Sequence, residues 1–341
     1  MDGFAKLPTP DQAVVFREAA TQMGMPEKFV AKDFWVCWTL DKLFGLPKVG
    51  PHLIFKGGTS LSKVFGVTER FSEDIDVSLS REWLGFGGEN DPERAPSRNK
   101  EREQLKALSA ACAMKIHEAL VPGLEKSFQS VLGTAGNDWR LEIEAADPQT
   151  VRFYYPGHPD PVTEGGGMLP YVKIELGARS DDWPAETKSV RSYAAERVPK
   201  PFKRPACDVR VLAVERTFWE KATILHAEYH RPSEKALPGR LSRHYADIYQ
   251  LIEKGVARNA DTNLALLERV VQHKRLFFRS AWANYEAAKP GTLRIVPPPH
   301  RLAGLREDYR KMQEMFFSEP PSFATVLAKL GNWETDFNTR K

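Results

Sequence analysis

The chain has few of the features that mark secreted and membrane proteins. Its 341 residues contain three cysteines, Cys37, Cys112 and Cys207, an odd number and far apart. Neither a disulfide framework nor a zinc site built from close cysteine pairs is therefore expected. No run of about 18 apolar residues could cross a membrane, and the first residues lack the apolar segment of a signal peptide. We expect a cytoplasmic protein with reduced thiols.

Several familiar motifs of nucleotide and metal chemistry are also missing. The chain has neither the G-x-x-x-x-G-K-[ST] spacing of a P-loop nor the G-x-G-x-x-G of dinucleotide-binding folds. His226 and His230 have a spacing that can bind zinc, but the Glu of an H-E-x-x-H pattern is absent. We interpret these two histidines and His244 as surface residues or as contacts for RNA or a nucleotide.

The composition that remains is typical of a globular protein. Hydrophobic residues make up 42% and charged residues 28% of the chain, which argues against wholesale disorder. The net charge of +4 is unevenly distributed, because residues 188–243 contain thirteen Lys or Arg and six Asp or Glu. A local basic surface suits RNA or nucleotide phosphates, although a solvated face is the simpler alternative. The run "RVPKPFKRP" (197–205) either follows an RNA backbone or is an ordinary connector.

Hydrophobic periodicity predicts an α+β protein with a helical C-terminal part. We expect a mixed-sheet domain with N-terminal helices over residues 1–185, and a mainly helical domain over residues 186–341. The individual predictions are helices over 10–46 and 100–120, strands near 52–56, 74–80, 139–145, 151–157 and 171–178, a mobile loop over 84–100, a turn at 165–167, a connector over 180–206, and helices beyond it.

The segment "FKGGTSLSKVFG" suggests a phosphate-binding turn. A short apolar strand ends at Gly57 and Gly58, and Thr59 or Ser60 begins a helix. Glycines let the backbone approach a phosphate closely, and the start of a helix offers free N–H groups and a positive dipole end. Lys63, about one turn further on, would add positive charge.

The segment "SEDIDVS" suggests a site for a divalent metal ion. Side chains alternate along a strand, so Asp74 and Asp76 should share one face while Ile75 and Val77 face the core. Two adjacent carboxylates repel each other, and Mg²⁺ is commonly held by one or two carboxylates plus substrate phosphates. Each motif alone is more often structural, but both within 25 residues predict nucleotidyl transfer.

These motifs resemble those of the AbiEii/AbiGii nucleotidyltransferase toxin family, which includes MenT-type toxins and has a polymerase-beta-like fold. The resemblance covers residues 28–255. Besides "FKGGTSLSKVFG…RFSEDIDVSL", it rests on "KDFWVCWTLDKLF" (32–44), "YVKIELGAR" (171–179), "ERTFWEKATILHA" (215–227) and "SRHYADIYQL" (242–251).

The resemblance implies a role for each matching residue. Gly57, Gly58, Thr59 and Ser60 fall on the phosphate-gripping turn, and Asp74 and Asp76 on the metal-binding aspartates. Lys221 would hold the triphosphate, and Asp247 would orient Lys221 or contact the nucleotide. Ser72 matches a hydroxyl that a kinase-like partner phosphorylates. For a third carboxylate we choose Glu175, with Glu142 and Glu144 as rivals that also alternate with apolar residues.

The resemblance also implies an activity and partners. The protein would be the toxin of a type IV-like toxin–antitoxin system, connected with phage defence, that uses Mg²⁺ or Mn²⁺ to transfer NMP from an NTP. The expected acceptor is RNA, at the tRNA 3′ end, which would block translation. A cognate antitoxin is the expected protein partner. The alternatives are NMP transfer to a protein or small-molecule hydroxyl, and a non-catalytic NTP-binding module.

Overall fold

The chain folds into two compact units. The computed structural model describes residues 1–136, 138–157 and 168–339, so the turn predicted at 165–167 lies outside the described residues. The first unit comprises Met1–Val64 and Ser72–Leu212, and the second comprises Phe65–Phe71 and Ala213–Lys341. The division falls later than the predicted one at 185/186, because two further strands after residue 184 complete the sheet of the first unit.

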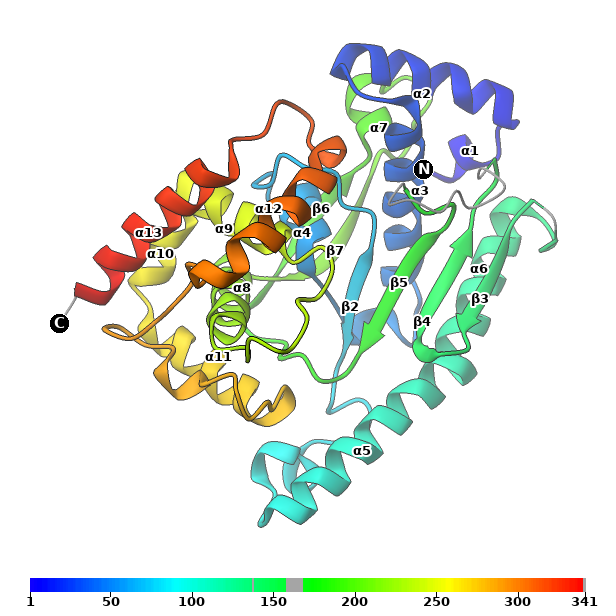
Figure 1. Ribbon diagram of the computed structural model, residues 1–341. Coiled ribbons are helices and arrows are strands. Elements are labelled where there is room, and N and C mark those ends of the chain that lie inside the picture. The colour runs from blue at the N-terminus through cyan, green and yellow to red at the C-terminus, as the bar shows by residue number, and fades with distance from the viewer. Residues whose placement is uncertain (137, 158–167, 340–341) are drawn as a thin grey trace. The chain divides into compact units, whose positions relative to one another are not determined.

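The first unit is built on one mixed sheet of seven strands in the order β3-β4-β5-β2-β1-β7-β6 (Figure 1). β2 pairs in parallel with β5, and β1 with β7, whereas the other neighbours are antiparallel. This sheet with its flanking helices confirms the α+β class. The strands are β1 (Leu53–Lys56), β2 (Ile75–Leu79), β3 (Arg140–Glu144), β4 (Asp147–Tyr154), β5 (Val172–Gly177), β6 (Ala185–Arg191) and β7 (Ala206–Leu212).

Helix α3 is the central helix of the first unit. It contacts both β5 and β7, which lie on opposite sides of the β2–β1 pair, so it crosses the middle of the sheet. Its aromatic side chains Phe34, Trp35 and Trp38 are fully or almost fully buried. The helices of this unit are α1 (Asp2–Ala5), α2 (Thr9–Met23), α3 (Glu27–Phe44), α4 (Gly57–Lys63), α5 (Arg98–Lys115), a π-helical turn (Ile116–Leu120), α6 (Val121–Leu132) and α7 (Tyr193–Arg197).

Local sequence signals account for several of these boundaries. α2 begins at Thr9 with Pro10 in its first turn, and it ends where Gly24 adopts a left-handed conformation (φ 64°). The predicted connector over 180–206 is wrong, because it contains β6 and α7. β6 pairs with β7 along its whole length while most of its side chains are exposed. Because few of its side chains are buried, this edge strand lacks the alternation of apolar and polar residues from which strands are predicted.

The second unit is helical, as predicted. Its helix α8 contacts α9, α10 and α11, and Phe218 and Trp219 of α8 pack against Trp333 of α13. Its helices are α8 (Val214–Tyr229), α9 (Ser242–Glu253), α10 (Val256–Asp261), α11 (Leu264–Phe277), α12 (Leu302–Lys311) and α13 (Phe323–Thr339). Among the described residues of either unit, no helix is long and apolar enough to span a membrane.

Candidate active site

The turn between β1 and α4 brings the backbone against an acidic side chain. α4 begins at Gly57, two residues earlier than predicted, and Gly57 has a φ of +82° that side-chain-bearing residues rarely adopt. A Cβ atom at this position would lie 1.9 Å from Oδ2 of Asp76. Glycine is therefore required twice here, for the backbone conformation and for the close approach of the Asp76 carboxylate.

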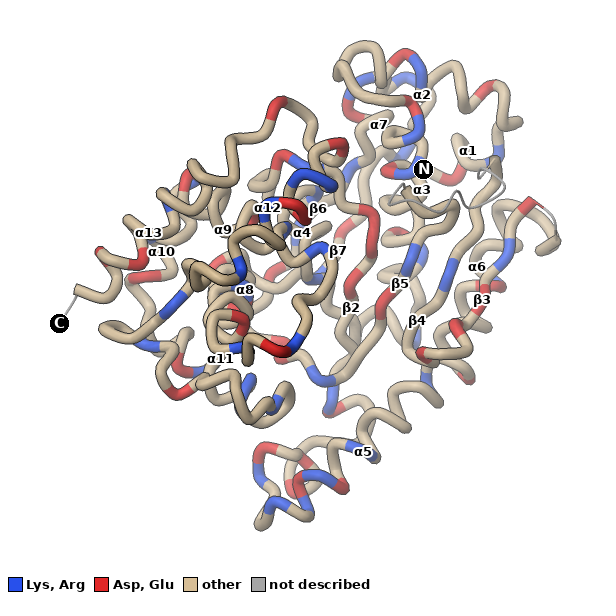
Figure 2. Tube along the Cα trace, in the orientation of Figure 1, with Lys and Arg blue, Asp and Glu red and all other residues tan. Residues whose placement is uncertain are grey.

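The two predicted aspartates lie at the start of β2, where the sheet brings a third carboxylate beside them. Asp74 precedes the strand and Asp76 belongs to it, and both alternate with the fully buried Ile75 and Val77. The parallel pairing of β2 with β5 makes Glu175 the register partner of Asp76. Figure 2 shows acidic positions on both of these strands. Burial, together with the nearby carboxylates of Glu175 and Asp74, raises the pKa of Asp76 to about 6 against the opposing charge of Lys56.

The sheet order distinguishes the three candidates for the third carboxylate. Glu175 lies on the strand next to β2, whereas Glu142 and Glu144 lie on β3, the edge strand. Glu142 pairs with Arg140 (2.6 Å) and Glu144 with Arg152 (2.8 Å). Glu175 is itself paired with Lys173. The topology thus favours Glu175, and its catalytic role stays a prediction.

The carboxylates fit a cation that is shared with a substrate. Oδ1 of Asp74 is buried and has no hydrogen-bond partner among the described residues. The described part of the chain contains no group of three or more His, Cys, Asp or Glu side chains close enough to hold a metal ion. Two aspartates together with substrate phosphates are a common coordination of Mg²⁺. The residues present therefore fit such an ion as long as the nucleotide completes its ligands.

Ser72 is connected to this site through Thr59. Thr59 Oγ1 donates to the carbonyl oxygen of Asp74 (2.5 Å) and lies 2.8 Å from Ser72 Oγ. Because a hydroxyl has one proton, Ser72 donates in the second bond. Ser72 lies outside β2, and the hydroxyl chain links it to the backbone of Asp74. That it shares a face with Asp74 and Asp76 stays a prediction.

Lys63 has a buried partner in the first unit. Its ammonium group lies 2.8 Å from Oδ1 of Asp33 in α3, and both side chains are almost completely buried. Although burial acts in the opposite direction, Asp33 raises the pKa of Lys63 above its ordinary value. Lys63 thus anchors the end of α4, and its predicted contact with the nucleotide stays a prediction.

Lys221 and Asp247 form a separate buried cluster in the second unit. Lys221 Nζ lies 2.9 Å from Asp247 Oδ2, and Arg70 donates to both oxygens of Asp247 at 2.8 and 2.9 Å. Although burial acts to raise it, these two cations hold the pKa of Asp247 well below its ordinary value. Burial lowers the pKa of Lys221. This geometry favours Asp247 as the residue that orients Lys221.

Arg70 is the member of this cluster that the sequence did not reveal. It lies four residues before Asp74, in the segment Phe65–Phe71 that belongs to the second unit, and its partner is 177 positions away. The one feature of the sequence that could have pointed to Arg70 is its position shortly before the D-x-D motif.

His244 also belongs to this cluster, because its Nδ1 lies 3.5 Å from Lys221 Nζ. Burial and the charge of Lys221 push the pKa of His244 well below its ordinary value, so the ring is neutral.

Two residues from segments with predicted nucleic-acid contacts are buried. Phe202, in the basic run 197–205, is buried with its ring centroid 4.5 Å from that of Phe4, so it is not available to stack on a base. His226 is fully buried, and its ring nitrogens lie 3.0 Å from the carbonyl oxygen of Asn284 and the amide nitrogen of Arg294. It is therefore a core residue of the second unit and not a surface contact.

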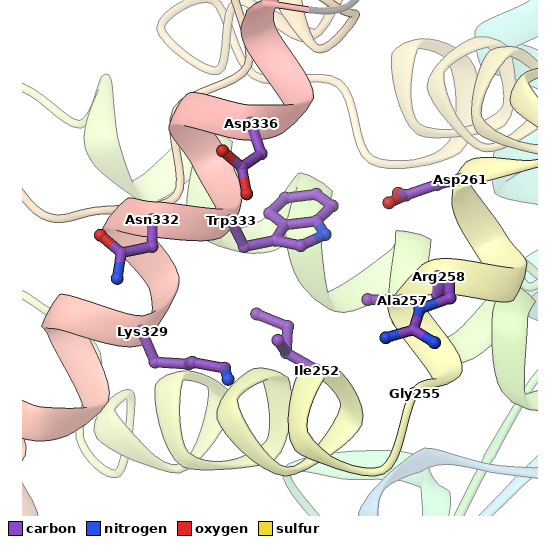
Figure 3. Close-up of a pocket in the computed structure, with 9 residues that line it drawn as sticks. All are labelled: Ile252, Gly255, Ala257, Arg258, Asp261, Lys329, Asn332, Trp333 and Asp336. Atoms are coloured by element: carbon purple, nitrogen blue, oxygen red, sulfur yellow. The ribbon is translucent and has the colours of Figure 1, made fainter.

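The second unit also contains a cavity of about 300 Å³ between α9, α10 and α13 (Figure 3). Arg258, Lys329 and Trp333 line it, and none of the predicted site residues does. Trp333 Nε1 is buried without a hydrogen-bond partner among the described residues. Lys329 pairs with Glu253 (2.5 Å).

The fold can now be compared with known proteins. A solved structure of MenT4, a nucleotidyltransferase toxin from Mycobacterium tuberculosis H37Rv, is similar to this chain with a TM-score of 0.53 and 16% sequence identity. The similarity covers 96% of this chain and 90% of that one. The protein therefore has the fold of a MenT nucleotidyltransferase.

The family follows from the sequence match. Residues 38–329 match the model of the family described as nucleotidyl transferase AbiEii toxin, type IV toxin–antitoxin system. The chain belongs to this AbiEii family and is thus a nucleotidyltransferase of the toxin class. No curated protein matches it significantly. The resemblance found in the sequence motifs is confirmed, and a cognate antitoxin and an NTP substrate follow from the family.

Proposed function

We propose that the protein transfers NMP from an NTP to RNA, at the 3′ acceptor end of tRNA, in a reaction that depends on Mg²⁺ or Mn²⁺ and blocks translation. The observation that carries this proposal is the carboxylate set behind the glycine turn. Asp74 has a buried, unpartnered oxygen, Asp76 has a raised pKa, and Gly57 lies against Asp76. Like charges are gathered here at a cost that a bound cation would offset.

In the proposed mechanism the residues of the two units have separate roles. The N–H groups of the turn at Gly57–Ser60 would bind the triphosphate, as helix N-termini bind anions. Asp74 and Asp76 would hold the ion together with the substrate phosphates, and the ion supplies charge neutralisation and orientation of the phosphates. Glu175, on the neighbouring strand, is the proposed third carboxylate of the site. The acceptor hydroxyl would attack the α-phosphorus and give its proton to a carboxylate as pyrophosphate leaves in line. Lys221, oriented by Asp247, would stabilise charge on the leaving phosphates.

Ser72 is the proposed site of control by a kinase-like antitoxin. A phosphate on its hydroxyl would add about −1.5 to −2 charges next to the Asp74 segment and break the hydrogen bond to Thr59. The added charge would compete for the cation and block transfer. Incubation with ATP and the cognate antitoxin should phosphorylate the wild type and leave Ser72→Ala unmodified and active. An antitoxin that silences Ser72→Ala equally well would contradict this proposal.

The experiment that tests the function is transfer of label to cellular acceptors. The purified protein is incubated with Mg²⁺, total cellular RNA and each α-³²P-labelled NTP in turn, beside an Asp74→Asn/Asp76→Asn control. We expect label in a tRNA-sized band with the wild type alone. Label in a protein or a small molecule instead would favour the other acceptors. NTP binding without transfer to any acceptor would favour a non-catalytic binding module.

A further inference from the structure

Lys32 of α3 contacts the chain just before both strands that carry the carboxylates. Its side chain is fully buried, and its ammonium group donates to the carbonyl oxygens of Leu169 (2.6 Å) and Tyr171. It also lies 3.2 Å from Oε2 of Glu73. Tyr171 directly precedes β5, and Glu73 directly precedes Asp74. One buried cation therefore ties the leading ends of β2 and β5 together.

Asp33, the next residue, makes an equivalent connection to the glycine turn. Its carboxylate pairs with Lys63 at the end of α4 (2.8 Å) and accepts the backbone N–H of Tyr193 at the start of α7 (2.6 Å). Lys63 Nζ also lies 3.5 Å from the centroid of the Tyr193 ring. α4 is only seven residues long, so a fixed last residue fixes the first turn at Gly57 as well.

The buried charges of Lys32 and Asp33 add little to the stability of the fold, which suggests that they are kept because they position other residues. Two charges taken out of water stabilise a fold no better than apolar residues of the same size, because desolvation offsets their attraction. Adjacent residues on a helix point about 100° apart, so Lys32 and Asp33 can reach different elements from one place. The pair lies in the helix that crosses the middle of the sheet, within reach of both halves of the candidate site.

We propose that Lys32 and Asp33 are positioning residues with separate tasks, which rests on the proposed function of the carboxylates and the turn. Lys32 sets the relative position of β2 and β5, and thus of Asp74, Asp76 and Glu175. Asp33 sets α4, and thus the backbone N–H groups that bind phosphate. Loss of Lys32 should weaken metal binding roughly 10- to 100-fold, as for other residues that orient metal ligands. Loss of Asp33 should weaken nucleotide binding roughly tenfold.

The test compares Lys32→Met and Asp33→Asn with two matched controls from α3. Lys28→Met removes an exposed lysine, and Asp41→Asn removes a half-buried aspartate outside both contacts. Mn²⁺ affinity is measured by electron paramagnetic resonance, and nucleotide affinity with a fluorescent non-hydrolysable NTP in the absence of metal. We expect Lys32→Met to lower the Mn²⁺ affinity and Asp33→Asn to lower the nucleotide affinity, while both controls bind as the wild type does.

A second variant keeps the test decisive if Lys32→Met does not fold. Lys32→Met/Glu73→Leu removes both buried charges, so no lone charge remains in the core, but it still loses the contacts to Leu169 and Tyr171. Circular dichroism and thermal melting establish that each variant is folded. The folded double variant should keep the Mn²⁺ defect.

The outcomes separate this inference from the proposed function. Normal Mn²⁺ affinity in a folded Lys32 variant would overturn the positioning roles. An equal loss of Mn²⁺ and nucleotide affinity in the Lys32 and Asp33 variants would overturn them as well. Because the two binding measurements need no turnover, they support or overturn the positioning roles even if the wild type labels no RNA. Absence of transfer by the wild type, with both binding defects as expected, would count against the proposed function alone.

Discussion

The candidate site residues of the first unit and those of the second unit have opposite arrangements of charge. In the first unit, acidic groups of like charge lie together, and burial with its carboxylate neighbours raises the pKa of Asp76 to about 6. In the second unit, Asp247 lies between the cations of Arg70 and Lys221, and its pKa is held low. The first arrangement leaves a cost of like charges that a bound cation would offset, whereas in the second the cations and the carboxylate compensate one another. The carboxylates are therefore suited to bind a ligand, and the cation cluster to orient one side chain.

The largest effect should come from the carboxylates of the first unit. Asp74→Asn/Asp76→Asn should reduce nucleotidyl transfer by about a thousandfold, equal to about 4 kcal/mol of transition-state stabilisation, because the metal ligands are lost. The melting temperature should not fall, since the change relieves repulsion between like charges. Transfer rates and thermal melts measure the two effects. A variant that melts well below the wild type would show that the carboxylates stabilise the fold.

The second unit should respond in the opposite way. Asp247→Asn leaves two buried cations without their anion, so the free energy of unfolding should fall by about 3 kcal/mol. Glu69→Gln, which breaks the exposed pair with Lys254, is the matched control and should cost at most about 1 kcal/mol. Urea denaturation measures both changes. Equal stability of the two variants would contradict the view that this cluster compensates its own charge.

Gly57→Ala should affect both stability and activity. The left-handed backbone costs a residue other than glycine about 1–2 kcal/mol, and the new methyl group would also displace the Asp76 carboxylate. Gly66→Ala is the control, because Gly66 has a similar φ of +59° with no atom within 4 Å of an added Cβ. Both variants should lose stability, and Gly57→Ala alone should lose transfer activity. Similar activity in both would mean that contact with Asp76 is unimportant.

The stability of the second unit should also depend on pH through His226. Burial lowers the pKa of His226 to about 4, whereas an imidazole in the unfolded chain has a pKa of about 6.5. Between these values the unfolded chain binds the proton and the folded protein does not. The free energy of unfolding should therefore fall by at most about 1.4 kcal/mol per pH unit as the pH drops from 6.5 to 4. His226→Gln should reduce the pH dependence of the free energy of unfolding measured by urea denaturation. An unchanged dependence would mean that other groups cause it.

The sequence predicted most of the local structure around the candidate site. β1, the turn at Gly57, α4 and the alternation of Asp74 and Asp76 with Ile75 and Val77 follow from glycines, apolar runs and period-two spacing. The family also follows from these motifs and their order. β6 was missed because its exposed side chains do not alternate, and the buried position of Phe202 was missed because it lies in a basic run. His226 was interpreted as a surface or contact residue although its neighbours Leu225 and Ala227 are apolar.

The sequence by itself thus determined the motifs, the fold class and the family, because glycine positions, apolar periodicity and the order of the motifs can all be read along the chain. The tertiary structure decided which distant residues meet. Strand pairing places Glu175 beside Asp76, and buried ion pairs join Lys63 to Asp33 and Arg70 to Asp247. The segment Phe65–Phe71 belongs to the second unit although its neighbours in sequence belong to the first. Strand pairing and buried ion pairs join positions far apart in the chain, and no local pattern specifies such partners.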